Sequence, residues 1–190
     1  MSKPANIVLT GFMGTGKSTV GRLVAGRLKL PFIDTDALIE ARTGRTIPAI
    51  FAEDGESAFR AMERDVCAEL ADQRGLVIAT GGGTLIDPRN CAVLAPNAMI
   101  VCLWASPEAI ESRLSHTGHR PLAATWRGLL EQRTPIYRQL PYHVDTTGAR
   151  APRHRTGGHR AVAGIPDRSF TGGRVSTRDR AWSGPACFRV

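Results

Sequence analysis

The sequence lacks any apolar run that approaches the roughly 18 residues needed to span a bilayer. Its first residues also lack the charged and apolar pattern of a secretory signal peptide. These absences exclude a membrane-spanning helix and lead us to expect a soluble, cytoplasmic protein with no membrane partner. No internal repeat is visible, and 190 residues suit one domain with a sizeable core.

Cysteine is scarce, and the four cysteines are widely spaced without a C-x-x-C motif. We therefore predict neither a disulfide nor a metal site built from them. Cys67 and Cys102 stand among apolar residues and are predicted to be buried thiols.

The net charge of +8 is unevenly distributed along the chain. Residues 1–150 have 17 Lys and Arg against 15 Asp and Glu, whereas residues 151–190 have 8 Arg against 2 Asp. The basic excess is thus a property of the C-terminal segment and not of a domain face. That segment has no lysine and no organised aromatic residues, so we expect no nucleic-acid partner.

Residues 11–18 read Gly-Phe-Met-Gly-Thr-Gly-Lys-Ser and fit G-x-x-x-x-G-K-S/T, the phosphate-binding P-loop. An apolar run over residues 6–10 predicts a strand before it, and helical spacing over residues 19–30 predicts a helix after it. An incidental glycine-rich turn would lack this flanking pattern. In this motif backbone N–H groups cradle phosphates, Lys17 contacts the β- and γ-phosphates, and Ser18 contacts Mg²⁺.

Two carboxylates, Asp34 and Asp36, follow a second short strand that ends at about residue 33. Alternating residues of an extended segment point the same way, so we expect both to face the P-loop. One carboxylate can hold Mg²⁺ or its waters, and the other can accept a proton from a substrate hydroxyl. A turn with local Asp hydrogen bonds is the alternative.

Three glycines, residues 81–83, directly follow a third apolar run over residues 76–79. They let a ligand lie against the backbone, although a flexible loop is the alternative. Further strands are predicted over residues 99–104 and 142–145. Strands that alternate with helices predict a three-layer α/β/α fold with a five-stranded parallel sheet.

A long helix over about residues 56–73 carries Arg60 and Glu63, which are close enough to pair. Residues 116–122 are polar and basic, as expected of a lid that closes over a phosphoryl-transfer site. Arg120 in this segment would stabilise charge on the transferring phosphoryl group. A short helix over residues 129–132 is predicted to end before a proline.

Together these motifs resemble the shikimate kinase family. The P-loop is followed in order by Asp34-Thr35-Asp36, Phe59-Arg60, Gly81-Gly82-Gly83, Arg120-Pro121-Leu122 and Arg133-x-Pro-x-Tyr137. The P-loop alone is shared by a vast superfamily, but the ordered set is much more specific and covers about residues 5–152. The resemblance implies a P-loop NTPase fold of the nucleoside monophosphate kinase type, with residues 1–152 as the kinase domain.

The family phosphorylates the 3-hydroxyl of shikimate with ATP and Mg²⁺, a step of aromatic amino-acid biosynthesis. The resemblance implies that Lys17, Asp36 and Arg120 are catalytic. It implies ATP contacts from Gly14, Thr15, Gly16, Lys17, Ser18, Thr19, Arg113 and Arg120. It implies shikimate contacts from Asp36, Arg60, Gly81, Gly82, Gly83 and Arg133, and a metal site at Ser18 and Asp34.

Within this set the arginines have distinct implied roles. Arg60 and Arg133 would grip the carboxylate of shikimate, because guanidinium forks bind carboxylates bidentately. Arg113 would stack on the adenine ring of ATP. Glu63 would orient Arg60. We expect the protein to act as a monomer.

Two features depart from the family pattern. The interval from Arg120 to Arg133 is short, and residues 153–190 have no leucine and no helical apolar spacing where the family has an amphipathic helix. This Arg- and Gly-rich composition predicts an irregular tail. We hypothesise that the tail is a frameshifted or otherwise non-native reading. A nucleotide sequence in which no alternative frame encodes an amphipathic helix would reject this.

Three other functions stay open. Another small-molecule P-loop kinase, such as a gluconate kinase, shares the P-loop but does not need the rest of the ordered set. An inactive nucleotide-binding relative would result if the short lid segment and the atypical tail abolish turnover. Nucleic-acid binding through the Arg-rich tail is the third, and a steep salt dependence of RNA binding would indicate it.

Overall fold

The computed structural model describes residues 5–116 and 126–149. Its strands form one sheet in the order β2-β3-β1-β4-β5, and every neighbouring pair is parallel. The strands are β1 (Asn6–Thr10), β2 (Phe32–Asp34), β3 (Val77–Ala79), β4 (Ala98–Trp104) and β5 (Tyr142–Asp145). The predicted five-stranded parallel sheet is confirmed.

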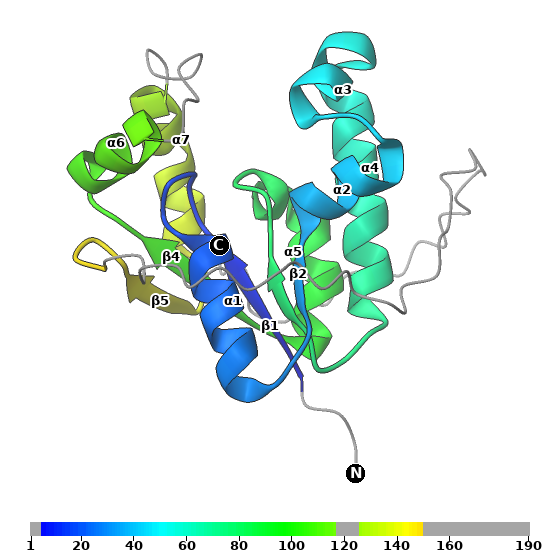
Figure 1. Cartoon of the computed structure of the whole chain (residues 1–190), viewed down its shortest axis with the longest axis horizontal. Coiled ribbons are helices and arrows are strands. Elements are labelled where there is room, and N and C mark those ends of the chain that lie inside the picture. Colours follow the sequence, from blue (N-terminus) through cyan, green and yellow to red (C-terminus); the bar gives the residue numbers. More distant parts are fainter. Residues whose placement is uncertain (1–4, 117–125, 150–190) are drawn as a thin grey trace.

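Helices cover both faces of this sheet (Figure 1). They are α1 (Lys17–Leu28), α2 (Thr35–Thr43), α3 (Ile47–Glu53), α4 (Gly55–Ala71), α5 (Pro88–Leu94), α6 (Pro107–His116) and α7 (Trp126–Arg138). Two 3₁₀ turns, η1 (Thr84–Ile86) and η2 (Ala95–Asn97), flank α5. Helix α1 packs on one face, whereas α4, α5 and α7 pack on the other, as the predicted three-layer fold requires.

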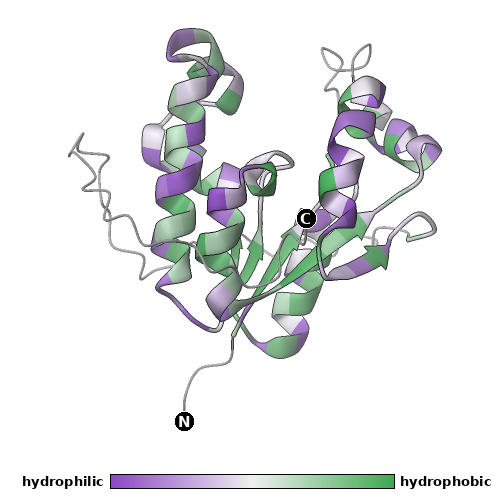
Figure 2. Cartoon of the chain, turned by 180° about the vertical axis from the view of Figure 1, so that it is seen from behind, coloured by the Kyte–Doolittle hydropathy of each residue, from purple (hydrophilic) through white to green (hydrophobic). Residues whose placement is uncertain are grey.

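The core is divided in two by the sheet, because successive strand residues point to opposite faces. Leu9 of β1 packs in the cluster beneath α1, whereas its neighbour Val8 joins the larger cluster beneath α4, α5 and α7. Figure 2 shows apolar residues concentrated on the strands and on helix faces turned toward them. The sheet is therefore buried on both sides over its central strands, as parallel sheets are.

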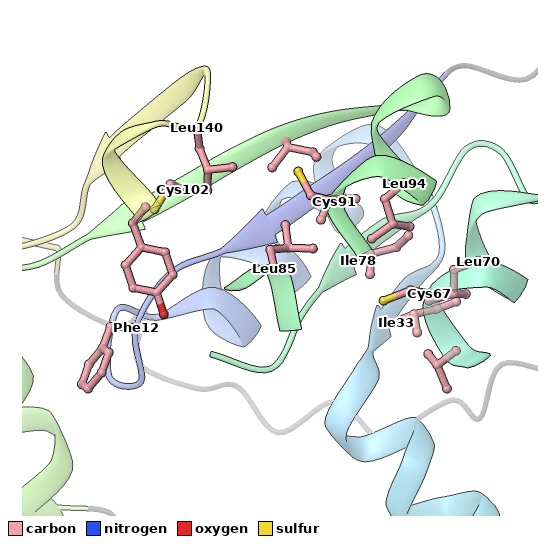
Figure 3. Packing of buried hydrophobic residues seen from close by; sticks show 14 of the residues in the cluster. Phe12, Ile33, Cys67, Leu70, Ile78, Leu85, Cys91, Leu94, Cys102 and Leu140 are labelled. Carbon is pink, nitrogen blue, oxygen red and sulfur yellow. The ribbon is translucent and has the colours of Figure 1, made fainter. Parts of the chain in front are cut away.

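The larger cluster contains three buried cysteines, Cys67, Cys91 and Cys102 (Figure 3). Burial raises the pKa of the Cys67 thiol and the pKa of the Cys102 thiol to about 12. Both thiols stay protonated at neutral pH and act as small apolar side chains. The prediction that Cys67 and Cys102 are buried thiols is confirmed.

Helix α7 is longer than the sequence predicted. It continues through Pro135, which lacks an N–H and gives up one helical hydrogen bond. The continuation places Tyr137, 2% exposed, in the core, and Trp126 at the other end of the helix is also buried. Packing at these two aromatic residues outweighs the local preference of proline to end a helix. Helix α5, with proline at its start and Asp87 as its N-cap, was not predicted.

Among residues 5–116 and 126–149, no helix is both long and apolar enough to cross a membrane. The predicted lid arginine Arg120 and the predicted irregular tail, residues 153–190, lie outside the described residues.

Candidate active site

A cavity of about 600 Å³ opens at the carboxyl ends of the strands. In Figure 1, α2, α3 and α4 rise on one side of this end of the sheet, and α6 and α7 rise on the other. The residues predicted to bind the acceptor all line the cavity: Asp36, Arg60, Gly81, Gly82, Gly83 and Arg133. Helices α2, α4 and α7 and the loop after β3 thus bring together groups that lie far apart in the sequence.

The P-loop connects β1 directly to α1. Gly14 and Gly16 have φ of +76° and +90°, a conformation that favours glycine. Helix α1 begins at Lys17 with no side-chain cap and no acidic residue in its first turn. Its first N–H groups therefore face the loop with a positive dipole end, and no carboxylate of that turn itself competes for them. Thr19 is exposed on the same first turn.

The first glycine of the loop, Gly11, lies against the backbone of β4. Its φ is +127°, and a Cβ built on it would lie 2.3 Å from the carbonyl oxygen of Leu103. Neither the backbone conformation nor the space admits a side chain. The close approach holds the P-loop against the sheet and fixes where its N–H groups point.

We expect Gly11→Ala to lower the free energy of unfolding by about 3 kcal/mol, from backbone strain and overpacking together. Gly26→Ala is the matched control, because Gly26 lies within α1 with nothing within 4 Å of a built Cβ. Alanine there should stabilise by about 0.5–1 kcal/mol through helix propensity. Urea unfolding of both variants measures the difference, and equal effects would contradict the crowding at Gly11.

The Lys17 side chain folds back over the P-loop. Its Nζ donates to the carbonyl oxygens of Gly11 and Phe12 at 2.8 and 2.9 Å. Desolvation by burial lowers the pKa of Lys17 to about 8, and the negative charges of Asp36 and Asp34 partly oppose this. The hydroxyl of Thr15 is likewise used inside the loop, where it donates to the Phe12 carbonyl oxygen.

Ser18 and Asp34 lie together, as predicted for the metal site. The Ser18 hydroxyl donates to Asp34 Oδ2 at 2.6 Å. The other oxygen, Asp34 Oδ1, caps α2 by accepting from the backbone N–H of Asp36 and of Ala37. The cap fixes the carboxylate beside the P-loop. A hydroxyl and a carboxylate are the hard oxygen ligands that suit Mg²⁺ held mainly by phosphates and water.

Asp36 faces the site, but for a different reason from the one predicted. It lies in the first turn of α2 and not on an extended segment, so the alternation argument was wrong. Its Oδ1 is buried and has no hydrogen-bond partner among the described residues. Burial, followed by the charges of Asp34 and Glu63, raises the pKa of Asp36 to about 6. Asp36 thus lines the cavity with a carboxylate whose hydrogen-bonding capacity is not used up within the described residues.

Arg60 is held on α4 by two carboxylates. Its guanidinium donates to Glu63 at 2.6 Å and to Glu56 at 2.9 Å, which confirms the predicted pairing with Glu63. Glu63 is 1% exposed and also accepts from the Thr84 hydroxyl at 2.5 Å. Because Glu63 is buried and its oxygens are both used, it fixes the direction of Arg60 toward the cavity.

The glycine loop is crowded by these same side chains. A Cβ on Gly81 would lie 2.6 Å from Asp36 Oδ1 and 2.9 Å from the Thr84 hydroxyl. The Gly81 N–H donates to Thr35 Oγ1 at 3.0 Å. Glycine is needed here because the backbone itself approaches the Asp36 carboxylate.

A family model described as shikimate kinase matches residues 13–161 of this chain. The chain belongs to the shikimate kinase family. A Thermus thermophilus shikimate kinase is 48% identical over 156 residues, which cover 78% of this chain and 85% of the relative. One from Pelotomaculum thermopropionicum is 46% identical over 147 residues, 74% of this chain and 86% of the relative.

A solved structure of the Acinetobacter baumannii shikimate kinase in complex with shikimate has the same fold, with a TM-score of 0.71 and 39% identity. The match covers 76% of this chain and 84% of that chain. The resemblance to the shikimate kinase family that the motifs indicated is confirmed.

Arg113 of α6 joins the P-loop to the segment after β5. Its guanidinium donates to the carbonyl oxygens of Gly14 at 3.0 Å and of Thr146 at 2.5 Å. The Thr146 hydroxyl donates in turn to the carbonyl oxygen of Thr15 at 2.8 Å. These bonds use N–H groups in the guanidinium plane and leave its flat faces for stacking. The role on adenine given to Arg113 by the family pattern stays a prediction.

Several cavity residues were not predicted as site residues. These are Met13, Glu40, Ile47, Pro48, Phe59, Glu63 and Leu114. Phe59 belongs to the apolar stripe of α4, and at 5% exposure it both packs in the core and lines the cavity. A helical stripe cannot indicate which of its members reaches a cavity, so only the fold identifies it.

Proposed function

We propose that this protein transfers the γ-phosphoryl group of ATP to the 3-hydroxyl of shikimate, as a cytoplasmic monomer without a nucleic-acid or membrane partner. The observation that carries the proposal is that Asp36, whose carboxylate has an unpartnered oxygen, lines one cavity together with Arg60 and Arg133. A hydroxyl donor satisfies the carboxylate, and an acceptor carboxylate satisfies the guanidinium groups. An anionic polyol such as shikimate offers both.

The residues of the chain divide the chemistry between them. The P-loop N–H groups and Lys17 bind and orient the phosphates of ATP. Ser18 and Asp34 would hold Mg²⁺, which when bound neutralises phosphate charge. The Asp36 carboxylate accepts the proton of the 3-hydroxyl as the hydroxyl oxygen forms a bond to the γ-phosphorus and ADP leaves.

Release of ADP, followed by a coupled assay, tests the proposal. ATP is supplied with shikimate, with gluconate or with no acceptor. We expect ADP release with shikimate that exceeds the release in the other two mixtures at least tenfold. Equal release with gluconate would assign the protein to another acceptor. Nucleotide binding without acceptor-dependent release would identify an inactive relative.

We expect Arg60→Ala to raise KM for shikimate by about 10- to 100-fold, the effect of losing hydrogen bonds to a charged group. KM for ATP should change by less than about threefold. The variant leaves the buried Glu63 carboxylate without its guanidinium partner, so its thermal unfolding is measured as well. Arg60→Lys keeps a positive charge for Glu63 but lacks the fork, and it should show the same KM pattern at higher stability.

Arg64→Ala is the control, because Arg64 lies one turn further along α4 and outside the cavity lining. Its kinetic constants should match those of the unsubstituted protein. Unchanged shikimate kinetics in both Arg60 variants would remove Arg60 from the acceptor site.

A further inference from the structure

The proposed function gives no role to Tyr137, the last residue of the Arg133-x-Pro-x-Tyr137 motif. Tyr137 lies four residues after Arg133 on α7, which places both side chains on the same face of the helix. Tyr137 is 2% exposed, and its hydroxyl donates to the carbonyl oxygen of Gly82 at 2.5 Å. A buried phenol is thus bonded to the middle residue of the glycine loop, 55 positions away.

The neighbouring guanidinium approaches the same loop residue as Tyr137, because Arg133 Nη1 lies 3.8 Å from a Cβ built on Gly82. Burial raises the pKa of the Tyr137 phenol to about 12, and the charge and hydrogen bond of Arg133 oppose that rise. The ring of Trp104 packs edge-on against the Tyr137 ring, with centroids 6.3 Å apart. The phenolic oxygen is therefore held in one place, between the glycine loop and the arginine.

The glycine loop depends on such outside contacts. Glycine has the largest conformational freedom of any residue, so three in succession do not hold a shape by themselves. Thr35 fixes the N–H of Gly81, and Tyr137 fixes the carbonyl of Gly82. Because a peptide unit is planar and trans, the Gly83 N–H of the same unit must point away from Tyr137.

We infer that Tyr137 is a positioning residue for the acceptor: its hydroxyl locks the Gly82–Gly83 peptide and the Arg133 guanidinium into one arrangement that the acceptor then meets. The inference rests on the proposed function for the identity of the acceptor. Through this bond, α7 and the loop after β3 form one wall of the cavity.

Tyr137→Phe tests the inference, because it removes only the hydroxyl. The matched control is Tyr142→Phe, the other tyrosine of the chain, which is 55% exposed on β5. We expect Tyr137→Phe to raise KM for shikimate about tenfold, the equivalent of one buried hydrogen bond, with KM for ATP unchanged within about twofold. Tyr142→Phe should change neither constant.

A merely structural role would lower the midpoint of thermal unfolding while leaving the ratio of the two KM values unchanged, and that result would overturn the inference. Amide hydrogen exchange of residues 81–83 provides a readout that does not depend on the acceptor. It should be about tenfold faster in Tyr137→Phe than in Tyr142→Phe, whereas exchange in β3 should be equal. If shikimate is not a substrate of the unsubstituted protein, the proposed function fails. The exchange result alone then supports or overturns the inference that Tyr137 fixes the Gly82–Gly83 peptide.

Discussion

Replacing Lys17 with alanine is expected to lower kcat for shikimate phosphorylation by about 10³-fold or more, the largest effect that we predict for one side chain. Phosphoryl transfer needs positioning and charge neutralisation more than covalent chemistry, and the loss of one preorganised charge or donor costs about 10²–10⁵-fold in such sites. The Nζ of Lys17 lies among the loop carbonyl oxygens, so no other side chain described here occupies its place.

Two further variants distinguish the loss of the Lys17 ammonium charge from a disturbance of the P-loop structure. Lys17→Met keeps the length of the stem and removes the ammonium, so it should lose as much activity as Lys17→Ala. Lys29→Ala removes a positive charge from an exposed position at the end of α1 and should leave kcat unchanged. The measurement is the coupled ADP assay at saturating shikimate. If Lys17→Ala keeps more than about a tenth of the activity, Lys17 does not have the role given to it here.

The nucleotide half of the site could be predicted from local sequence because its physics is local. The strand, the glycines and the helix start stand within about twenty consecutive residues, and the structure places them as expected. Asp34 was identified from its place at the end of the second strand. The argument for Asp36 assumed an extended backbone, whereas the cap made by Asp34 starts α2 at that point and turns Asp36 into the cavity.

The acceptor half could not be derived from spacing. Arg60 and Arg133 come from different helices, and the glycine loop follows a third element of the fold. From the sequence, only the resemblance to the shikimate kinase family indicated that these residues belong to one site. The hydrogen bonds that fix the site link residues 21, 55 and 99 positions apart, such as Arg113 to Gly14. No periodicity in the sequence indicates contacts between residues so far apart. Pro135 also led us to predict that the helix ends before Tyr137, whereas α7 continues through both residues.

Replacing Asp36 with asparagine is expected to lower kcat by about 10³-fold, within the range for loss of a general base. Asparagine has nearly the same shape and can still bond a hydroxyl, but it cannot take the proton. KM for shikimate should therefore change much less than kcat. Asp65→Asn, an equivalent change at an exposed position of α4, is the control and should be without effect. A variant that loses affinity but keeps kcat would make Asp36 a binding residue only.

The pH dependence of kcat/KM gives the second test, because it reports ionisation in the free enzyme. Burial and the nearby charges of Asp34 and Glu63 raise the pKa of Asp36 to about 6. Below that pH the Asp36 carboxylate is protonated, so kcat/KM should fall tenfold for each pH unit. Burial lowers the pKa of Lys17 to about 8, so above that pH its positive charge is lost and kcat/KM should fall again. In Asp36→Asn the acid limb should disappear from the residual activity while the alkaline limb stays. An acid limb near pH 6 that persists in Asp36→Asn would show that another group is the base.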